Sequence, residues 1–338
     1  MITRPPPRLE LQSEPWQRDL AAAVTDPVKL LDLLGLDPAS LPDTDTAATG
    51  FPLRVPRYFV NLMRHGDPHD PLLAQVLPLA AEQLSMAGYR QDPVGDMHAS
   101  RDHGVLKKYH GRALMITTGA CAIHCRYCFR RHFPYAEQSL LGQWREALET
   151  LRRLPDTEEL ILSGGDPLCL SDRRLGDLLG QTRNLPGLRR LRIHSRLPVV
   201  LPQRVTDRLV VLLAEQHLPT VLVIHANHPN EITPELERAL KRLAAAGTTL
   251  LNQSVLLKSV NDDADTLAEL SDVLFGIGVM PYYLHLLDPV AGAAHFAVPL
   301  QRAQALLEQL RLRLPGYLVP RMVRELPGEP YKTPVSHL

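Results

Sequence analysis

The 338-residue chain has little of what marks a nucleic-acid-binding, membrane or disulfide-rich protein. Its 37 basic and 37 acidic residues give a net formal charge of zero, so no general attraction to nucleic acid or anionic lipid is expected. Apolar runs such as 209–214 fall far short of the ~20 residues that span a bilayer, and the N-terminus lacks the apolar core of a secretory signal. Four cysteines are too few for a disulfide framework. We therefore expect a cytoplasmic globular protein without nucleic-acid or membrane partners.

Proline, by contrast, is abundant, and its 30 copies divide the chain into short segments. Residues 15–34 and 72–88 have the apolar spacing of helices, so residues 1–104 are predicted to form an N-terminal helical region. From residue 113 onward, β-rich runs alternate with segments of helical periodicity. The predicted strands are 113–118, 159–163, 190–194, 221–225, 250–255 and 281–287. The predicted helices are 140–154, 173–182, 206–216, 234–246, 264–275 and 300–314.

This alternation indicates an α/β fold with a parallel sheet and its helices outside. A partial barrel and a doubly wound open sheet both fit the pattern, and both place chemistry at the carboxyl ends of the strands. Polar residues gather at five of these ends, at the cysteines after 118 and at 164–166, 195–196, 225–228 and 288. We expect these strand ends to form the rim of an active site.

Cys121, Cys125 and Cys128 lie within eight residues, directly after the first strand of the alternation. Thiolates suit iron–sulfur clusters and zinc, and three of them can hold three corners of a [4Fe-4S] cubane while the fourth iron stays open. An alternative is a zinc site completed by His124 or Cys169. Structural zinc sites usually pair cysteines two residues apart, whereas the first gap here is three residues. The three–two spacing resembles that of radical S-adenosylmethionine enzymes, in which the open iron binds S-adenosylmethionine.

Further motifs follow at successive strand ends, and they carry a more specific resemblance. They are Cys-Arg-Tyr-Cys-Phe-Arg-Arg (125–131), Leu-Ser-Gly-Gly-Asp-Pro-Leu (162–168), Ser-Arg-Leu-Pro-Val-Val-Leu-Pro-Gln-Arg (195–204), His-Pro-Asn-Glu-Ile-Thr (228–233), Asn-Gln-Ser-Val-Leu-Leu (252–257) and Pro-Tyr-Tyr (281–283). With these motifs the chain resembles the lysine 2,3-aminomutase family. It is most similar to the short EpmB-type enzymes, which supply β-lysine for modification of elongation factor P. The resemblance implies a partial (β/α)6 barrel of radical S-adenosylmethionine type over 105–338, with a C-terminal segment that carries a pyridoxal phosphate lysine.

The resemblance also implies roles for individual residues. Lys332 would hold pyridoxal 5′-phosphate as a Schiff base, although a lysine near a chain end is ordinarily a surface group. Tyr109 and Arg112 would contact the cofactor phosphate. Arg130 would bind the substrate carboxylate, while Asp288 and Glu325 would bind its distant ammonium. The contacts expected for S-adenosylmethionine are Gly164, Gly165, Asp166, Ser195, His225 and Gln253.

Three positions depart from the family pattern. Glu325 stands where the lysine enzymes usually carry aspartate, and His285 stands where they carry tyrosine. Asp263 replaces a cysteine that ligates zinc in longer relatives, so no zinc is expected.

The predicted function is an isomerase that converts L-lysine to β-lysine and draws one electron at a time from a flavodoxin or ferredoxin. The β-lysine is expected to serve the modification of elongation factor P. One alternative is the same reaction in catabolism or small-molecule synthesis. Another, from a different class, is a non-enzymatic iron–sulfur or zinc-binding protein.

Overall fold

The centre of the molecule is one ten-stranded sheet whose strands follow one another in sequence order. The structure, a computed structural model, describes residues 14–41, 43–46, 48, 50–135, 144–154 and 156–335. The six predicted strands are all present, as β3 (Arg112–Thr118), β4 (Glu159–Gly164), β5 (Arg190–Ser195), β6 (Thr220–His225), β7 (Thr249–Leu256) and β8 (Met280–Leu286). A seventh parallel strand, β9 (Arg321–Arg324), pairs with β8.

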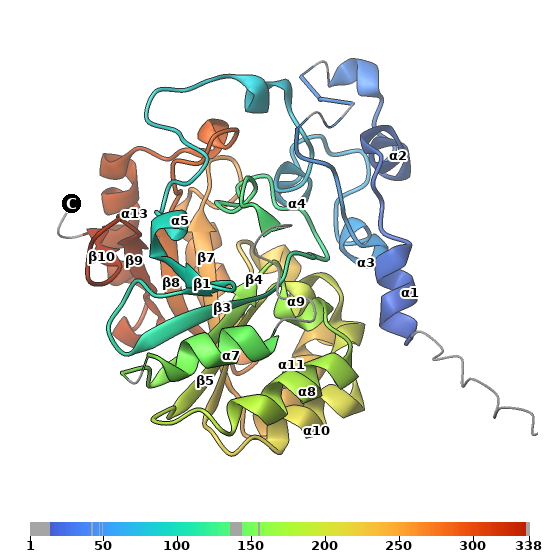
Figure 1. The fold of residues 1–338 in the computed structure, drawn as a ribbon. Helices are drawn as coiled ribbons and strands as arrows, with labels where there is room; N and C mark the ends of the chain where they lie inside the picture. The colour runs from blue at the N-terminus through green and yellow to red at the C-terminus, as the bar shows by residue number, and fades with distance from the viewer. Residues whose placement is uncertain are drawn as a thin grey trace, which may run out of the picture.

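Helices connect these parallel strands on the outside of the sheet (Figure 1). They are α7 (Trp144–Arg152), α8 (Asp172–Thr182), α10 (Asp207–Ala214), α11 (Pro234–Ala245), α12 (Ala264–Gly276) and α13 (Leu300–Arg313). The strand order never reverses from β3 to β9, which is the order of a barrel and not of a doubly wound sheet. Since β1 and β10 stand at the two ends of that order, the barrel is partial, and the predicted fold class is confirmed. The first four residues of the predicted helix 140–154 lie outside the described residues.

Short helices follow the strands at the edge where the site lies. These are η3 (Pro167–Cys169), α9 (Leu197–Val200), η4 (Pro202–Arg204), η5 (Pro229–Glu231) and η6 (Ala294–Phe296), whereas η7 (Gly316–Leu318) lies between α13 and β9. Each of the first four has proline at its first or second position, where the missing N–H costs no hydrogen bond.

Antiparallel strands extend the sheet at both ends. A hairpin of β1 (Ser100–Asp102) and β2 (Val105–Leu106) precedes β3, and β10 (Thr333–Pro334) pairs with β9. Strands of two or three residues are too short to show an alternating pattern, so the sequence did not indicate them. Pairing of Thr333 with Arg324 brings Lys332 beside Glu325.

The N-terminal region is helical in shorter pieces than predicted. It contains α1 (Pro15–Ala21), α2 (Pro27–Leu33), η1 (Pro38–Ser40), α3 (Arg57–Val60), α4 (Pro71–Ala74), η2 (Ala80–Gln83) and α5 (Asp96–Ala99). The prediction of one helix over 15–34 is wrong, because Asp26 caps a new helix that starts at Pro27. Over 72–88 the helix stops at Ala74, four residues before Pro78, which could not donate to a helix interior.

The N-terminal helices pack directly onto the barrel. Trp16, Leu30 and Phe59 belong to the same cluster of buried apolar side chains as Leu162 of β4 and Leu191 of β5. The division into a helical region and a barrel at residue 104 stays a prediction. Among the helices of the described residues, none is long and apolar enough to cross a membrane.

Candidate active site

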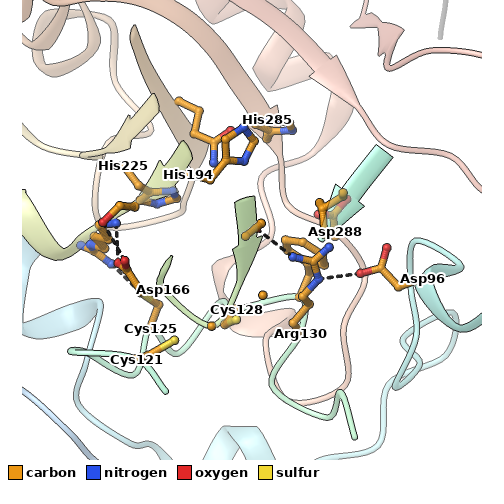
Figure 2. Close-up of a pocket in the computed structure, with 18 of the residues that line it drawn as sticks. Asp96, Cys121, Cys125, Cys128, Arg130, Asp166, His194, His225, His285 and Asp288 are labelled. Atoms are coloured by element: carbon orange, nitrogen blue, oxygen red, sulfur yellow. Dashed lines mark hydrogen bonds and ion pairs between the residues drawn. The ribbon is translucent and has the colours of Figure 1, made fainter. Parts of the chain in front are cut away.

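A cavity of about 360 Å³ opens at the carboxyl ends of the parallel strands. Parallel strands end at one edge of their sheet, so side chains from distant parts of the sequence meet there. The residues predicted for the cluster, S-adenosylmethionine, pyridoxal phosphate and substrate all line this cavity, namely Cys121, Cys125, Cys128, Gly164, Gly165, Asp166, Ser195, His225, Gln253, Lys332, Tyr109, Arg112, Arg130, Asp288 and Glu325. Figure 2 shows the cysteines on one side and Asp288 with Arg130 and Asp96 on the other.

The cysteine loop is held by close backbone contact with the loop after β4. Gly165 N donates to Thr118 O at 2.7 Å, and Asp166 N donates to Ala120 O at 2.8 Å. A Cβ at Gly165 would lie 2.4 Å from Ala120 O, and Gly164 has a φ of +117°, a conformation that favours glycine. Both glycines are therefore required for packing of the cysteine loop, and their contact with S-adenosylmethionine stays a prediction.

The thiols of the loop suit an iron–sulfur cluster. Burial raises the pKa of Cys121 well above its usual value and that of Cys128 to about 11, so both thiols are protonated in the metal-free protein and would release protons on binding iron. Arg196 Nη1 donates to Cys125 Sγ at 2.7 Å. His124, the alternative zinc ligand, stacks on Phe51 with ring centroids 5.1 Å apart.

Asp166 joins the loops that follow β4 and β5. Its carboxylate accepts hydrogen bonds from Ser195 Oγ at 2.7 Å, Leu168 N at 2.9 Å, Arg196 N at 2.8 Å and Leu197 N at 2.9 Å. Four donors leave little capacity on its two oxygens for a further partner. The structure thus gives Asp166 and Ser195 a bracing role at the rim, and direct contact of either with S-adenosylmethionine stays a prediction.

Arg130 lies at the start of a chain of alternating charges. Its Nε donates to Asp96 Oδ2 at 2.6 Å and its Nη1 to Ser163 Oγ at 3.2 Å. The other oxygen of Asp96 pairs with Lys108 Nζ at 2.5 Å. Although burial raises the pKa of Asp96, Arg130 and Lys108 bring it below the usual value, so the carboxylate is ionised and orients the guanidinium.

The chain continues through Glu325 to Lys332. Lys108 Nζ donates to Glu325 Oε1 at 2.6 Å, and Lys332 Nζ donates to Glu325 Oε2. Burial raises the pKa of Glu325, but the two ammonium groups outweigh burial and hold it well below the usual range. Lys332 is therefore not a free surface lysine, because β10 and Glu325 fix it in the cavity wall.

Asp288, at the end of β8, differs from the other acids because it lacks a close cation. Its Oδ1 atom is buried without a hydrogen-bond partner among the described residues. Burial and the charge of Glu325 raise its pKa to about 7, while Lys332, Lys108 and Arg324 oppose that rise from a distance. A buried carboxylate oxygen without a donor is costly, and a cationic ligand in the cavity would remove that cost.

Comparison with known proteins agrees with this geometry. The Radical SAM superfamily model matches residues 115–271. L-lysine 2,3-aminomutase of Escherichia coli (strain K12) is 50% identical over 325 residues, 96% of this chain and 95% of the relative. The chain belongs to the lysine 2,3-aminomutase family of radical S-adenosylmethionine enzymes. L-lysine 2,3-aminomutase of Haemophilus influenzae is 46% identical over 95% of this chain and 96% of that protein, and the one from Clostridium subterminale is 40% identical over 82% and 67%.

Membership confirms the resemblance found in the sequence. The chain is an aminomutase, hence an isomerase, and the family implies a [4Fe-4S] cluster, S-adenosylmethionine and pyridoxal phosphate as cofactors. Among solved structures, a radical SAM methyltransferase from Sphaerobacter thermophilus is 18% identical with a TM-score of 0.45, over 65% of this chain and 68% of that one.

The aminomutase cavity also contains neutral histidines. His194, His225 and His285 come from the ends of β5, β6 and β8 (Figure 2). Burial lowers the pKa of His285 to about 3 and those of the other two well below their usual value, so all three are uncharged at neutral pH. In the same cavity the Arg112 guanidinium lies 4.9 Å from the ring centre of Tyr109, and the two side chains form one cationic corner.

Sequence reasoning missed several residues of this aminomutase site, chiefly Asp96, Lys108 and His194, and it placed Arg196 at the rim without giving it a role. Lys108 stands directly before Tyr109, and Arg196 directly follows Ser195 in a quoted motif, so proximity to predicted site residues was a usable signal for both. Asp96 lies in the predicted helical region, 34 residues before its partner Arg130, and no local pattern marks it.

Proposed function

We propose that the chain converts L-lysine to β-lysine in a pyridoxal phosphate-dependent reaction, moving the amino group from C2 to C3. The names of its relatives support the reaction and the substrate. The observation that carries the proposal is the buried Oδ1 of Asp288, which has no hydrogen-bond partner among the described residues and lies in the same cavity as Arg130 and Lys332. Lysine has a carboxylate at one end and an ammonium at the other, and the cavity offers a cation and an acid to match.

The cofactors would supply the radical chemistry, and the protein would bind and orient the cofactors and the substrate. When bound, S-adenosylmethionine on the cluster supplies a radical that removes hydrogen from carbon, and pyridoxal phosphate supplies a conjugated ring that stabilises the unpaired electron. Cys121, Cys125 and Cys128 would hold the cluster. Lys332 would hold pyridoxal phosphate through its Nζ, with Tyr109 and Arg112 at the phosphate.

The two ends of lysine would be recognised by charge. Asp96 and Ser163 hold the Arg130 guanidinium in place, and a planar guanidinium suits a carboxylate. Glu325 is already neutralised by Lys108 and Lys332, so Asp288 is the acid that gains most from the substrate ammonium. Glu325, the second acid predicted at this end, would keep Lys108 as its partner while Lys332 holds pyridoxal phosphate.

We propose further that the product serves modification of elongation factor P. Support comes from the similarity to short EpmB-type enzymes and from the higher identity to the E. coli relative than to that of C. subterminale, 50% against 40%. The enzyme would work in the cytoplasm with a one-electron donor such as flavodoxin or ferredoxin.

The reaction is tested with enzyme reconstituted anaerobically with iron, sulfide, pyridoxal phosphate and S-adenosylmethionine, then reduced with dithionite. With lysine labelled with ¹⁵N at the α-position, the label should appear on C3 of β-lysine in NMR spectra. Glutamate and alanine serve as controls, since neither carries the distant ammonium that Asp288 would pair with. Turnover of these two and not of lysine would refute the substrate.

The cellular role needs a separate test. Elongation factor P purified from a strain that lacks this gene should lose the mass of one β-lysyl group, and the gene should restore it. An unchanged mass, together with active purified enzyme, would refute the role and leave the reaction intact.

A further inference from the structure

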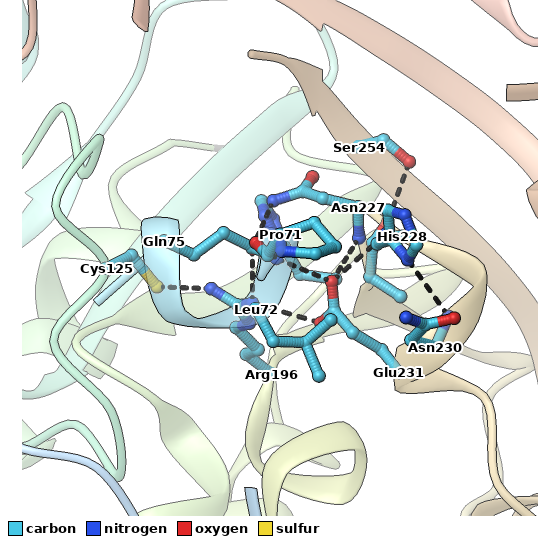
Figure 3. A network of polar contacts seen from close by, with 12 residues as sticks. Pro71, Leu72, Gln75, Cys125, Arg196, Asn227, His228, Asn230, Glu231 and Ser254 are labelled. Carbon is cyan, nitrogen blue, oxygen red and sulfur yellow. Dashed lines mark hydrogen bonds and ion pairs between the residues drawn. The ribbon is translucent and has the colours of Figure 1, made fainter. Parts of the chain in front are cut away.

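Arg196 is a buried arginine that connects the cysteine loop to the rest of the protein. It follows Ser195 at the end of β5, and its side chain is 7% exposed. Figure 3 shows it between Cys125 on one side and Gln75 with Glu231 on the other. Neither Arg196 nor the 228–233 motif that supplies Glu231 has a role in the reaction as described so far.

The guanidinium divides its donors between the cysteine loop and a buried acid. Nη1 donates to Cys125 Sγ at 2.7 Å and also to the hydroxyl of Tyr127. Nη2 donates to Gln75 Oε1 at 2.7 Å and to Glu231 Oε2 at 3.0 Å. Since the contacts diverge, the guanidinium is fixed from both sides and cannot turn away from Cys125 without breaking them.

Glu231 is the counterion of this arginine. Its side chain is fully buried, and its Oε1 accepts hydrogen bonds from Asn227 N at 2.8 Å, His228 N at 3.1 Å and Gln75 Nε2 at 3.1 Å. Together with Arg196 Nη2 at Oε2, these donors give both oxygens of the Glu231 carboxylate hydrogen-bond partners. A buried ion pair that only had to be stable could be replaced by apolar side chains at little cost, so its orientation toward a cluster ligand calls for a further reason.

We propose that Arg196 is a positioning residue that sets the reduction potential of the iron–sulfur cluster through its hydrogen bond to Cys125 Sγ. Reduction takes one electron from the external donor, adds one negative charge to the cluster and its thiolates, and moves no proton. A cationic donor at a ligand sulfur stabilises the more negative, reduced form. The potential is therefore higher with the hydrogen bond than without it, as hydrogen bonds to cluster sulfurs act generally.

The N-terminal region takes part in this control. Gln75 follows α4, and its Oε1 accepts from both Arg196 and Asn227. Its backbone oxygen accepts from Arg126 N at 3.0 Å, within the cysteine loop itself. The helices before the barrel thus hold the arginine and the loop in one fixed relation.

The test is a redox titration of the reconstituted enzyme without S-adenosylmethionine, followed by EPR of the reduced cluster. In Arg196→Met the equilibrium constant for reduction should fall at least tenfold, which is a shift of about 59 mV to lower potential for a one-electron couple. Arg196→Lys keeps the charge and should shift the potential less. Glu231→Gln removes the counterion, leaves the arginine charge less compensated, and should shift the potential upward.

Arg204→Lys is the matched control for Arg196→Lys. Arg204 is also fully buried and paired with an acid, Asp172, but its hydrogen bonds go to Leu168 O and Leu170 O and not to a cysteine. Arg204→Lys should therefore leave the reduction potential of the cluster unchanged. If Arg196→Met does not assemble a cluster, the other two variants still test the proposal. The potential should fall in Arg196→Lys and rise in Glu231→Gln.

Two results would overturn the proposal. One is a potential within error of wild type in the Arg196 variants. The other is a shift in the same direction in the Arg196 and Glu231 variants, which would indicate general loosening of the loop. An unchanged potential with weakened binding of S-adenosylmethionine would make Arg196 a ligand contact instead.

Discussion

Replacing Asp288 with asparagine tests substrate recognition most directly. The change keeps the shape of the side chain at the end of β8 and removes its charge. Because Glu325 already has two cationic partners, Asp288 is the acid left to pair with the distant ammonium of lysine. We expect Asp288→Asn to lose lysine turnover while it still binds the cluster and pyridoxal phosphate.

The magnitude follows from the value of one charged contact in a closed site. A hydrogen bond to a charged group contributes roughly 1.5–3 kcal/mol, and 1.4 kcal/mol is a factor of ten. The kcat/KM for lysine should therefore fall about ten- to a hundredfold, and further if the ammonium is left unpaired in the cavity. Turnover is measured with the labelled lysine under saturating cofactors. The control is Glu329→Gln, which removes one negative charge from an exposed residue outside the cavity lining and should leave kcat/KM unchanged.

Asp288→Asn should reduce lysine turnover, but it should stabilise the cofactor-free protein. The pKa of Asp288 is about 7 in the folded chain against about 3.9 for a free aspartate, so the folded state binds a proton that the unfolded state has released. The stabilising contribution of the protonated acid is complete below pH ~4 and is lost as the pH rises to about 7. A shift of about three units corresponds to roughly 4 kcal/mol. In thermal unfolding, the melting temperature of Asp288→Asn should exceed that of wild type at pH 8, and the difference should shrink toward pH 5.

Normal turnover of lysine by Asp288→Asn would refute this account. So would a stability difference that does not change between pH 5 and pH 8, because the aspartate would then have an ordinary pKa and lie open to water. Loss of turnover together with loss of bound pyridoxal phosphate would show that Asp288 supports the cofactor and not the substrate.

Three further changes test the cofactor sites. Cys125→Ala should lose most bound iron and all cleavage of S-adenosylmethionine, measured by iron content and release of 5′-deoxyadenosine, and full activity would contradict the cluster assignment. Lys332→Ala should lose the borohydride-trapped pyridoxal adduct while iron content stays normal, and undiminished labelling of another lysine would show that the wrong residue was chosen. Gly165→Ala should reduce cluster content several-fold, because its Cβ would meet Ala120 O at 2.4 Å, whereas Gly180→Ala, with open space around its Cβ, should not.

The parts of the fold that could be predicted are those with a local cause. The six strands from β3 to β8 are short β-rich runs, and the helices between them carry one apolar face, so each element is visible in about ten residues of sequence. The cysteine loop is equally local, because its three cysteines lie within eight residues. The 72–88 segment misled the prediction because its apolar spacing is helical while Pro78 prevents a helix from continuing.

The choice between an open doubly wound sheet and a barrel was not local. Both have the same alternation of strands and helices, and only the pairing of neighbouring strands distinguishes them. Pairing depends on how each helix packs back onto the sheet, which involves residues from several elements at once.

The sequence by itself determined which residues reach the strand ends and which chemistry they can perform. The tertiary structure decided which of them are partners. Lys108 and Glu325 are 217 residues apart in sequence, and Arg196 meets Gln75 across 121. No short-range pattern encodes such contacts, since each charge looks like a solvated surface group until the sheet brings its partner close and removes the water between them. Asp288 and Glu325 look alike in the sequence, since both are acids. In the folded chain Lys108 and Lys332 pair with Glu325, whereas the buried Oδ1 of Asp288 has no hydrogen-bond partner among the described residues.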